Sequence, residues 1–141
     1  MKIVYFLLIT LGLIISACAT SGAGGGEIPI PSKWKLESFG KAGAAAPVVT
    51  GSTVKLEFLE DGQLGGSGGC NSYGAKYEID GTNLSIKELV STLMACVDEK
   101  VMQQETLYFT ALQSASSFEI SGDKLTIFYG DGANQLNFVT Q

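Results

Sequence analysis

The sequence predicts an α+β fold that is mainly antiparallel β: a small, barrel-like curled sheet with one main helix packed on it. Turn signals recur about every ten residues through much of the chain after residue 33, and the segments between them alternate apolar and polar residues. Alternation with a period of two is typical of half-buried strands, and regularly spaced turns indicate antiparallel hairpins that curl into a barrel. One segment, at about 99–114, has a helical period instead.

The expected strands follow from this alternation, and Gly-containing turns separate several of them. They cover residues 34–38, 54–58, 64 onward into a glycine run, 77–79, 84–86, 118–120, 125–127 and 136–138. Six aromatic residues fall at inward positions, where we expect core packing or, alternatively, the lining of an apolar cavity. They are Trp34, Phe58, Tyr77, Tyr108, Phe118 and Phe138.

The helix is expected because its apolar residues recur every three or four positions rather than every two. Asp98 is a suitable N-cap, and Glu99 adds negative charge to the first turn, where the helix dipole favours it. The recurring inward positions are Val101, Glu105, Tyr108, Leu112 and Ala115. We therefore expect this helix to cover one face or one mouth of the sheet.

Two glycine-rich stretches interrupt the pattern. Residues 40–51 are low in complexity, and Gly40, Gly43 and Pro47 favour a mobile loop there over a helix. Residues 65–69 are Gly-Gly-Ser-Gly-Gly, but the stretch lacks the third glycine of a dinucleotide fingerprint and the Gly-Lys-Ser/Thr of a nucleotide-binding loop. We interpret it as a bulge, a sharp bend or close backbone packing.

The N-terminus predicts export. Residues 1–17 have the layout of a signal peptide, and residues 15–18, Ile-Ser-Ala-Cys, resemble the lipobox that precedes a lipidated cysteine. We expect Cys18 to carry the lipid, residues 18–32 to form a flexible tether, and residues 33–141 to form the domain. The location is then a bacterial envelope, the outer membrane in a Gram-negative cell. Ordinary signal cleavage, which would leave a diffusible protein, is the alternative.

Composition excludes several classes of function. The formal charge is −5, and all nine basic residues are lysines, so the chain is a poor partner for nucleic acid. Histidine is absent, which excludes Ser-His-Asp and Cys-His catalysis and histidine-based zinc sites. Acidic pairs at residues 60–61 and 98–99 fall at a turn and a helix start, so we interpret them as solvated turn and capping residues rather than as acid–base catalysts. We expect no enzyme activity, no catalytic residue, no cofactor and no metal.

Cys70 and Cys96 are the cysteines that remain once Cys18 is lipidated. An exported chain meets an oxidising compartment, so we expect these two to form a disulfide. Closing a loop of this size stabilises a fold by about 3.5 kcal/mol in the chain-entropy model. A redox role is the alternative, although no Cys-x-x-Cys motif or neighbouring cation supports it.

The spacing of two short motifs resembles the META domain, also called the HslJ-like family. The residues that carry the resemblance are Gly69, Cys70 and Asn71, followed by Thr92, Met94 and Cys96. The resemblance covers about residues 33–139. It implies an exported or lipid-anchored bacterial protein with a barrel-like sheet and a helix, a link to heat shock, and no established catalytic residues. Gly69, Asn71, Thr92 and Met94 are then structural motif residues.

Together these observations predict a non-enzymatic, membrane-anchored envelope lipoprotein with a stress-related role. We expect it to contact the membrane through its N-terminal lipid and to bind a hydrophobic ligand or an envelope protein. The alternative is a structural or inhibitory interaction module that presents the 40–51 loop to a partner.

Overall fold

A computed structural model describes residues 26–141 of the chain. The expected signal peptide at residues 1–17 and the expected lipidation site, Cys18, lie outside this range. Within it, the ordered domain begins earlier than the expected boundary at residue 33. Ile28 is buried in the core, so the last part of the expected tether packs against the barrel instead of hanging free.

The described chain forms nine strands and one helix, in the order of the sequence. They are β1 (Ser32–Lys41), β2 (Ala46–Pro47), β3 (Lys55–Phe58), β4 (Gln63–Ser67), β5 (Ser72–Asp80), β6 (Asn83–Ser91), α1 (Glu99–Gln113), β7 (Ala115–Ser121), β8 (Lys124–Tyr129) and β9 (Asn134–Thr140).

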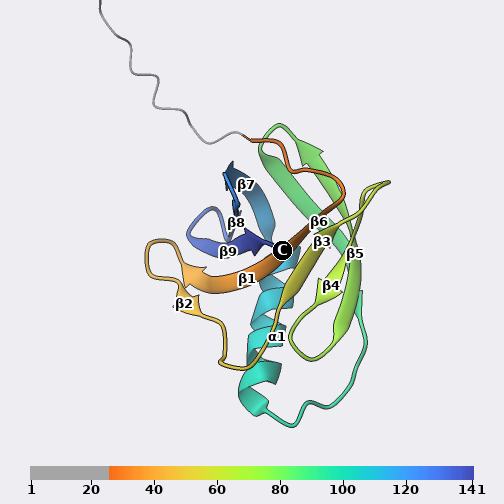
Figure 1. Ribbon diagram of the computed structural model, residues 1–141, viewed down its shortest axis with the longest axis vertical. Helices are drawn as coiled ribbons and strands as arrows, with labels where there is room; N and C mark the ends of the chain where they lie inside the picture. The colour runs from red at the N-terminus through yellow and green to blue at the C-terminus, as the bar shows by residue number, and fades with distance from the viewer. Residues whose placement is uncertain (1–25) are drawn as a thin grey trace, which may run out of the picture.

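All strand pairs are antiparallel, and neighbours in the sheet follow the chain order β1, β3, β4 to β9. Pairing of β1 with β9 closes these eight strands into a barrel, while the short β2 pairs only with β1 (Figure 1). The seam between β6 and β7 is short, because a single residue pair, Asn83 and Ser117, joins them. The expected curled antiparallel sheet is thus confirmed, and its weak seam is where the chain inserts the helix.

The hairpin turns form where the sequence places them. Asp61 and Gly62 both have positive φ, at 57° and 69°, between β3 and β4. Two successive positive φ angles define the type I′ turn, whose twist matches that of the flanking strands, and Asp-Gly is a preferred sequence for it. The hairpin of β5 and β6 turns at Gly81-Thr82, between the paired residues Asp80 and Asn83.

The helix α1 ends at Gln113, within one residue of the expected end, and Asp98 is its N-cap. The Asp98 carboxylate accepts a hydrogen bond from the backbone N–H of Lys100 at 2.8 Å. The inward face of α1 is formed by Gln104, Glu105, Tyr108, Ala111 and Leu112. Across residues 26–141, no helix is both long enough and apolar enough to span a membrane.

Side chains fill the barrel interior. All six aromatic residues expected to point inward are buried, and several of them contact one another edge to face, as Phe58 does with Tyr77. Tyr108 of α1 is fully buried: its hydroxyl is 2.7 Å from that of Tyr73, which also donates to the backbone oxygen of Lys55 at 3.0 Å. The helix therefore contributes directly to the core.

The 40–51 loop is more constrained than the expected mobile loop. Its middle forms β2, and the backbone N–H of Val48 donates to the oxygen of Glu37. The buried side chain of Gln104 accepts from Val49 N–H at 2.6 Å and donates to the Ser52 hydroxyl at 2.7 Å. The low-complexity sequence contained no sign of these contacts, because a distant helix residue makes the last two.

The buried tyrosine pair predicts a loss of stability at high pH. Burial raises the pKa of Tyr73 and of Tyr108 above the ordinary value, whereas an unfolded tyrosine ionises near pH 10. The stabilising contribution is therefore complete below about pH 10 and is lost as the pH rises further, at about 1.4 kcal/mol per pH unit for each tyrosine. Urea unfolding of the wild type and of Tyr108→Phe between pH 9 and 11.5 (a range chosen around the unfolded pKa) should give a shallower pH dependence for the variant. Equal slopes would contradict this assignment.

Candidate functional site

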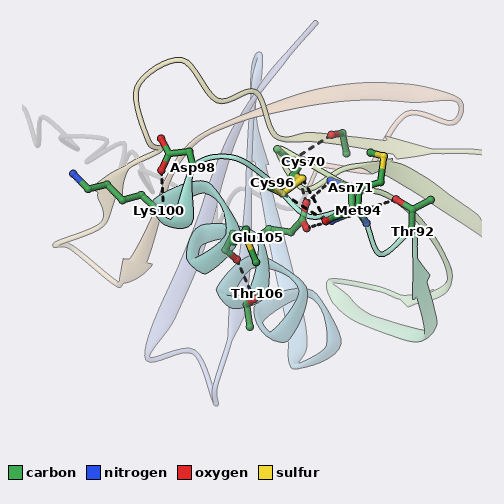
Figure 2. The surroundings of a disulfide bond; sticks show 12 residues. Cys70, Asn71, Thr92, Met94, Cys96, Asp98, Lys100, Glu105 and Thr106 are labelled. Carbon is green, nitrogen blue, oxygen red and sulfur yellow. Dashed lines mark hydrogen bonds between the residues drawn. A yellow bond between two sulfur atoms is a disulfide. The ribbon is translucent and has the colours of Figure 1, made fainter.

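Asn71 joins three segments of the chain at the start of β5 (Figure 2). Its side-chain oxygen accepts hydrogen bonds from the Thr92 hydroxyl at 2.8 Å and from the Met94 backbone N–H at 2.7 Å. Its side-chain nitrogen donates to Glu105 at 2.6 Å and to the Met94 backbone oxygen at 3.3 Å. All four hydrogen-bonding positions of the amide are used, so the orientation of this buried side chain is defined by its partners.

Glu105 of α1 supplies the acceptor on the other side. One carboxylate oxygen accepts from the backbone N–H groups of Cys70 and Asn71, at 3.1 and 2.6 Å, and the other accepts from the Asn71 side chain. Buried polar groups are costly unless they are hydrogen-bonded. No described buried side-chain nitrogen or oxygen lacks a hydrogen-bond partner. The bonds between Asn71, Glu105 and their neighbours satisfy the polar atoms of these two buried side chains.

The disulfide Cys70–Cys96 is present and lies beside this network, with Cα atoms 6.0 Å apart. It links the residue before Asn71 to the end of the segment 92–96, which Asn71 already holds. The connection between β6 and α1 is therefore attached twice to the start of β5, once covalently and once by hydrogen bonds. A further hydrogen bond, from the Thr92 N–H to the Ser72 backbone oxygen at 3.0 Å, joins the first residue of this connection to the first residue of β5.

Two glycines of the run before Cys70 lie against close neighbours: Gly66 against the backbone of Lys55 in β3, and Gly68 against side chains of α1. A Cβ atom on Gly68 would lie 2.6 Å from a carboxylate oxygen of Glu105 and 2.8 Å from the Phe109 ring, closer than non-bonded atoms allow. Gly69 has φ of +113°, which disfavours other residues. The interpretation of the glycine run as a bend with close packing is confirmed, and the elements that pack there are β3 at Gly66 and α1 at Gly68.

Cys70, Cys96 and Glu105 could be considered as metal ligands. The sulfur atoms of Cys70 and Cys96 and a carboxylate oxygen of Glu105 lie within 4.8 Å of one another. A metal would need thiolates, and both sulfurs are consumed by the disulfide. Because the carboxylate is also committed to three hydrogen bonds, the donor set does not fit a metal site in this oxidised state.

The attached segment presents apolar side chains to solvent. Leu93 and Val97 are 95% and 106% exposed, and Val90 and Met94 are also exposed. We call these four residues the apolar loop surface; Val90 lies at the end of β6, and the other three lie on the loop that follows it. The hydrogen bonds from Asn71 to Met94 involve only the Met94 backbone. The network therefore holds this loop in place without using the side chains of Leu93, Met94 or Val97.

The structure brings together Cys70, Asn71, Thr92, Met94 and Cys96, with Gly69 at the bend. Sequence reasoning placed Glu105 on the inward helix face but did not recognise it as the acceptor for Asn71. The detectable signal was the pair Gln104-Glu105, two long polar residues on an otherwise apolar face. The apolar loop surface was also missed; its signal was the presence of Leu93, Met94 and Val97 in a segment with no strand or helix period.

The Asn71–Glu105 bond predicts a mutual rescue. Asn71→Asp would place a second carboxylate against Glu105 and cost about 3 kcal/mol of unfolding free energy, whereas Glu105→Gln would oppose two N–H donors and cost about 1–3 kcal/mol. In the double variant, the new amide can donate to the new carboxylate, so the combined loss should be smaller than the sum. Urea unfolding measures all four proteins.

The control for this set of variants is Gln103→Glu, which makes the amide-to-carboxylate change of Asn71→Asp on the exposed side of α1. It should alter stability by less than about 0.5 kcal/mol. Losses that simply add in the double variant would show that Asn71 and Glu105 do not interact directly.

Comparisons with solved structures agree on the fold. An NMR structure of a protein from Burkholderia xenovorans is 23% identical, with a TM-score of 0.67, and the match covers 79% of this chain and 82% of that one. A crystal structure of a DUF4847 family protein from Bacteroides vulgatus is 14% identical, with a TM-score of 0.59, and the match covers 77% of this chain and 92% of that one. At such identities the likeness shows the fold alone.

No curated protein matches the chain. The family model of the META domain, however, matches residues 29–141, which include the whole barrel, the helix and both motif segments. The resemblance noted in the sequence is thereby confirmed, and the match begins close to Ile28, where the described chain first enters the core. The chain belongs to the META domain family.

Proposed function

We propose that this META domain protein is a non-enzymatic envelope lipoprotein that acts by binding a hydrophobic ligand or another envelope protein, in a stress-related role. The lipobox before Cys18 supports the anchor, and the absence of histidine and of a cofactor motif from the sequence supports a binding role over catalysis. The observation that carries the binding role is the apolar loop surface. Apolar side chains this exposed, four of them within residues 90–97, are typical of interaction sites.

The barrel interior is a weaker candidate for the binding site. Its central side chains, among them Tyr108, Phe58 and Phe138, have at most 1% of their surface exposed, so a ligand inside would have to displace core packing. The 40–51 loop is also weaker, because β2 and the bonds from Gln104 tie most of it to the domain. Binding outside the barrel, on the loop between β6 and α1, requires no such rearrangement.

The anchor predicts a defined mature chain. Intact mass of the protein extracted from membranes should correspond to a chain that begins at Cys18 and is heavier by its acyl groups. Cys18→Ala should lack this added mass and leave the membrane fraction, because the acyl chains provide the membrane affinity. An unmodified wild-type chain beginning near Ala19 or Thr20 would contradict the anchor and leave a diffusible protein.

The apolar loop surface predicts binding of a hydrophobic reporter. The folded protein should enhance the fluorescence of an environment-sensitive dye such as anilinonaphthalene sulfonate, and Leu93→Asp/Val97→Asp should reduce that enhancement several-fold. Both side chains are solvent-exposed, so the melting temperature should be nearly unchanged. Leu59→Asp, the same change at another exposed leucine, is the control and should retain the signal. Equal dye binding by all three proteins would place the binding site elsewhere.

A further inference from the structure

We propose that the apolar loop surface, Val90, Leu93, Met94 and Val97, is the docking site for a second envelope protein whose apolar groove is rimmed by lysine or arginine. The inference rests on the binding role proposed above and specifies the partner.

The composition of this surface matches the centre of a protein interface. Four of the eight exposed large hydrophobic residues in the described chain lie between residues 90 and 97. Residues 89–97 contain no charged side chain, although the domain carries many lysines and acidic residues elsewhere. Depletion of charge and enrichment of methionine distinguish interface centres from ordinary protein surface.

The loop is also preorganised for binding. The bonds from Asn71 to the backbone of Met94, the Thr92 hydroxyl bond and the disulfide at Cys96 hold its backbone in one conformation. A side chain presented on a rigid backbone loses less conformational entropy when a partner binds. The network thus holds the backbone of the loop, while the exposed side chains of Leu93, Met94 and Val97 take no part in its hydrogen bonds.

The two carboxylates next to the apolar loop surface, which we call its rim, select the charge of the partner. Asp98 and Glu99 follow the loop, are exposed, and have no ion-pair partner within residues 26–141, where the three ion pairs lie elsewhere. A basic rim on the partner would complement both carboxylates. A second copy related by two-fold symmetry about this loop would instead bring Asp98 and Glu99 close to their own counterparts, and each domain carries a net negative charge.

The position of the loop argues against the membrane as its occupant. The segment 92–98 crosses the end of the molecule opposite to the point where the chain enters at residue 26 (Figure 1). The eight residue steps from Cys18 to Gly26 reach at most about 29 Å when fully extended, so a lipid at Cys18 keeps the entry end of the domain within that distance of the bilayer. The surface also lacks the exposed aromatic and basic residues typical of membrane-surface segments.

The test uses the full-length protein with its own signal sequence, in the bacterium that makes it, with the photo-cross-linking residue benzoylphenylalanine at Leu93. The control carries the same probe at Leu59, an exposed leucine outside the surface. We expect an adduct from position 93, absent from position 59, whose cross-linked peptide maps by mass spectrometry to apolar residues flanked by lysine or arginine in another envelope protein.

The charge at the rim is tested in the same cells. Asp98→Asn/Glu99→Gln removes both charges while keeping an effective N-cap, since asparagine caps helices as well as aspartate does. It should lower the adduct yield at least five-fold, whereas Glu119→Gln/Asp123→Asn, the same change on exposed residues elsewhere, should leave the yield within two-fold.

Four results would overturn the proposal: an adduct only with a second copy, an adduct only with phospholipid, an equal adduct from position 59, or a yield insensitive to the rim charges. Each of these leaves the dye-binding and lipidation results unaffected, so failure of the docking proposal can be told apart from failure of the proposed function.

Discussion

The structure depends on one buried amide. Asn71 satisfies all four of its hydrogen-bonding positions with groups from the β6–α1 connection and from α1, and Glu105 then satisfies the backbone N–H groups at the start of β5. An amide has both donors and acceptors, so it can hold a hydroxyl, a backbone N–H, a carbonyl and a carboxylate at once. An apolar residue at position 71 would leave several buried groups without partners, which is far costlier than the loss of one bond.

This network compensates for the weakest part of the barrel. The β6–β7 seam has a single residue pair, and the chain between these strands forms the loop 92–98 and α1. The helix places Tyr108 and Leu112 in the core, and the disulfide and Asn71 attach its leading loop to β5. Covalent and hydrogen-bonded attachment at one point therefore positions the helix that completes the core.

The groups that hold the loop in place are different from the side chains that the loop exposes to solvent. Backbone groups, the Thr92 hydroxyl and the Cys96 sulfur make the contacts that hold it, and the side chains of Leu93, Met94 and Val97 make none of them. A protein that needs a rigid loop for stability alone would not need to expose aliphatic side chains there. The rigidity accounts for the motif residues Asn71, Thr92 and Cys96, and the exposure accounts for the binding role that we propose.

The sequence by itself determined the eight strands of the barrel, their turns, the helix and its N-cap, because period, glycine placement and capping chemistry are local properties. It also indicated the Cys70–Cys96 pair, since export and the number of cysteines left one partner for each. Only the tertiary structure decided what Glu105 and Gln104 bind and why Gly68 has no room for a side chain, because those contacts join residues 34 to 55 positions apart. It also decided which apolar residues of the β6–α1 connection face solvent, because exposure depends on where the helix and strands come to lie, and no local pattern encodes that.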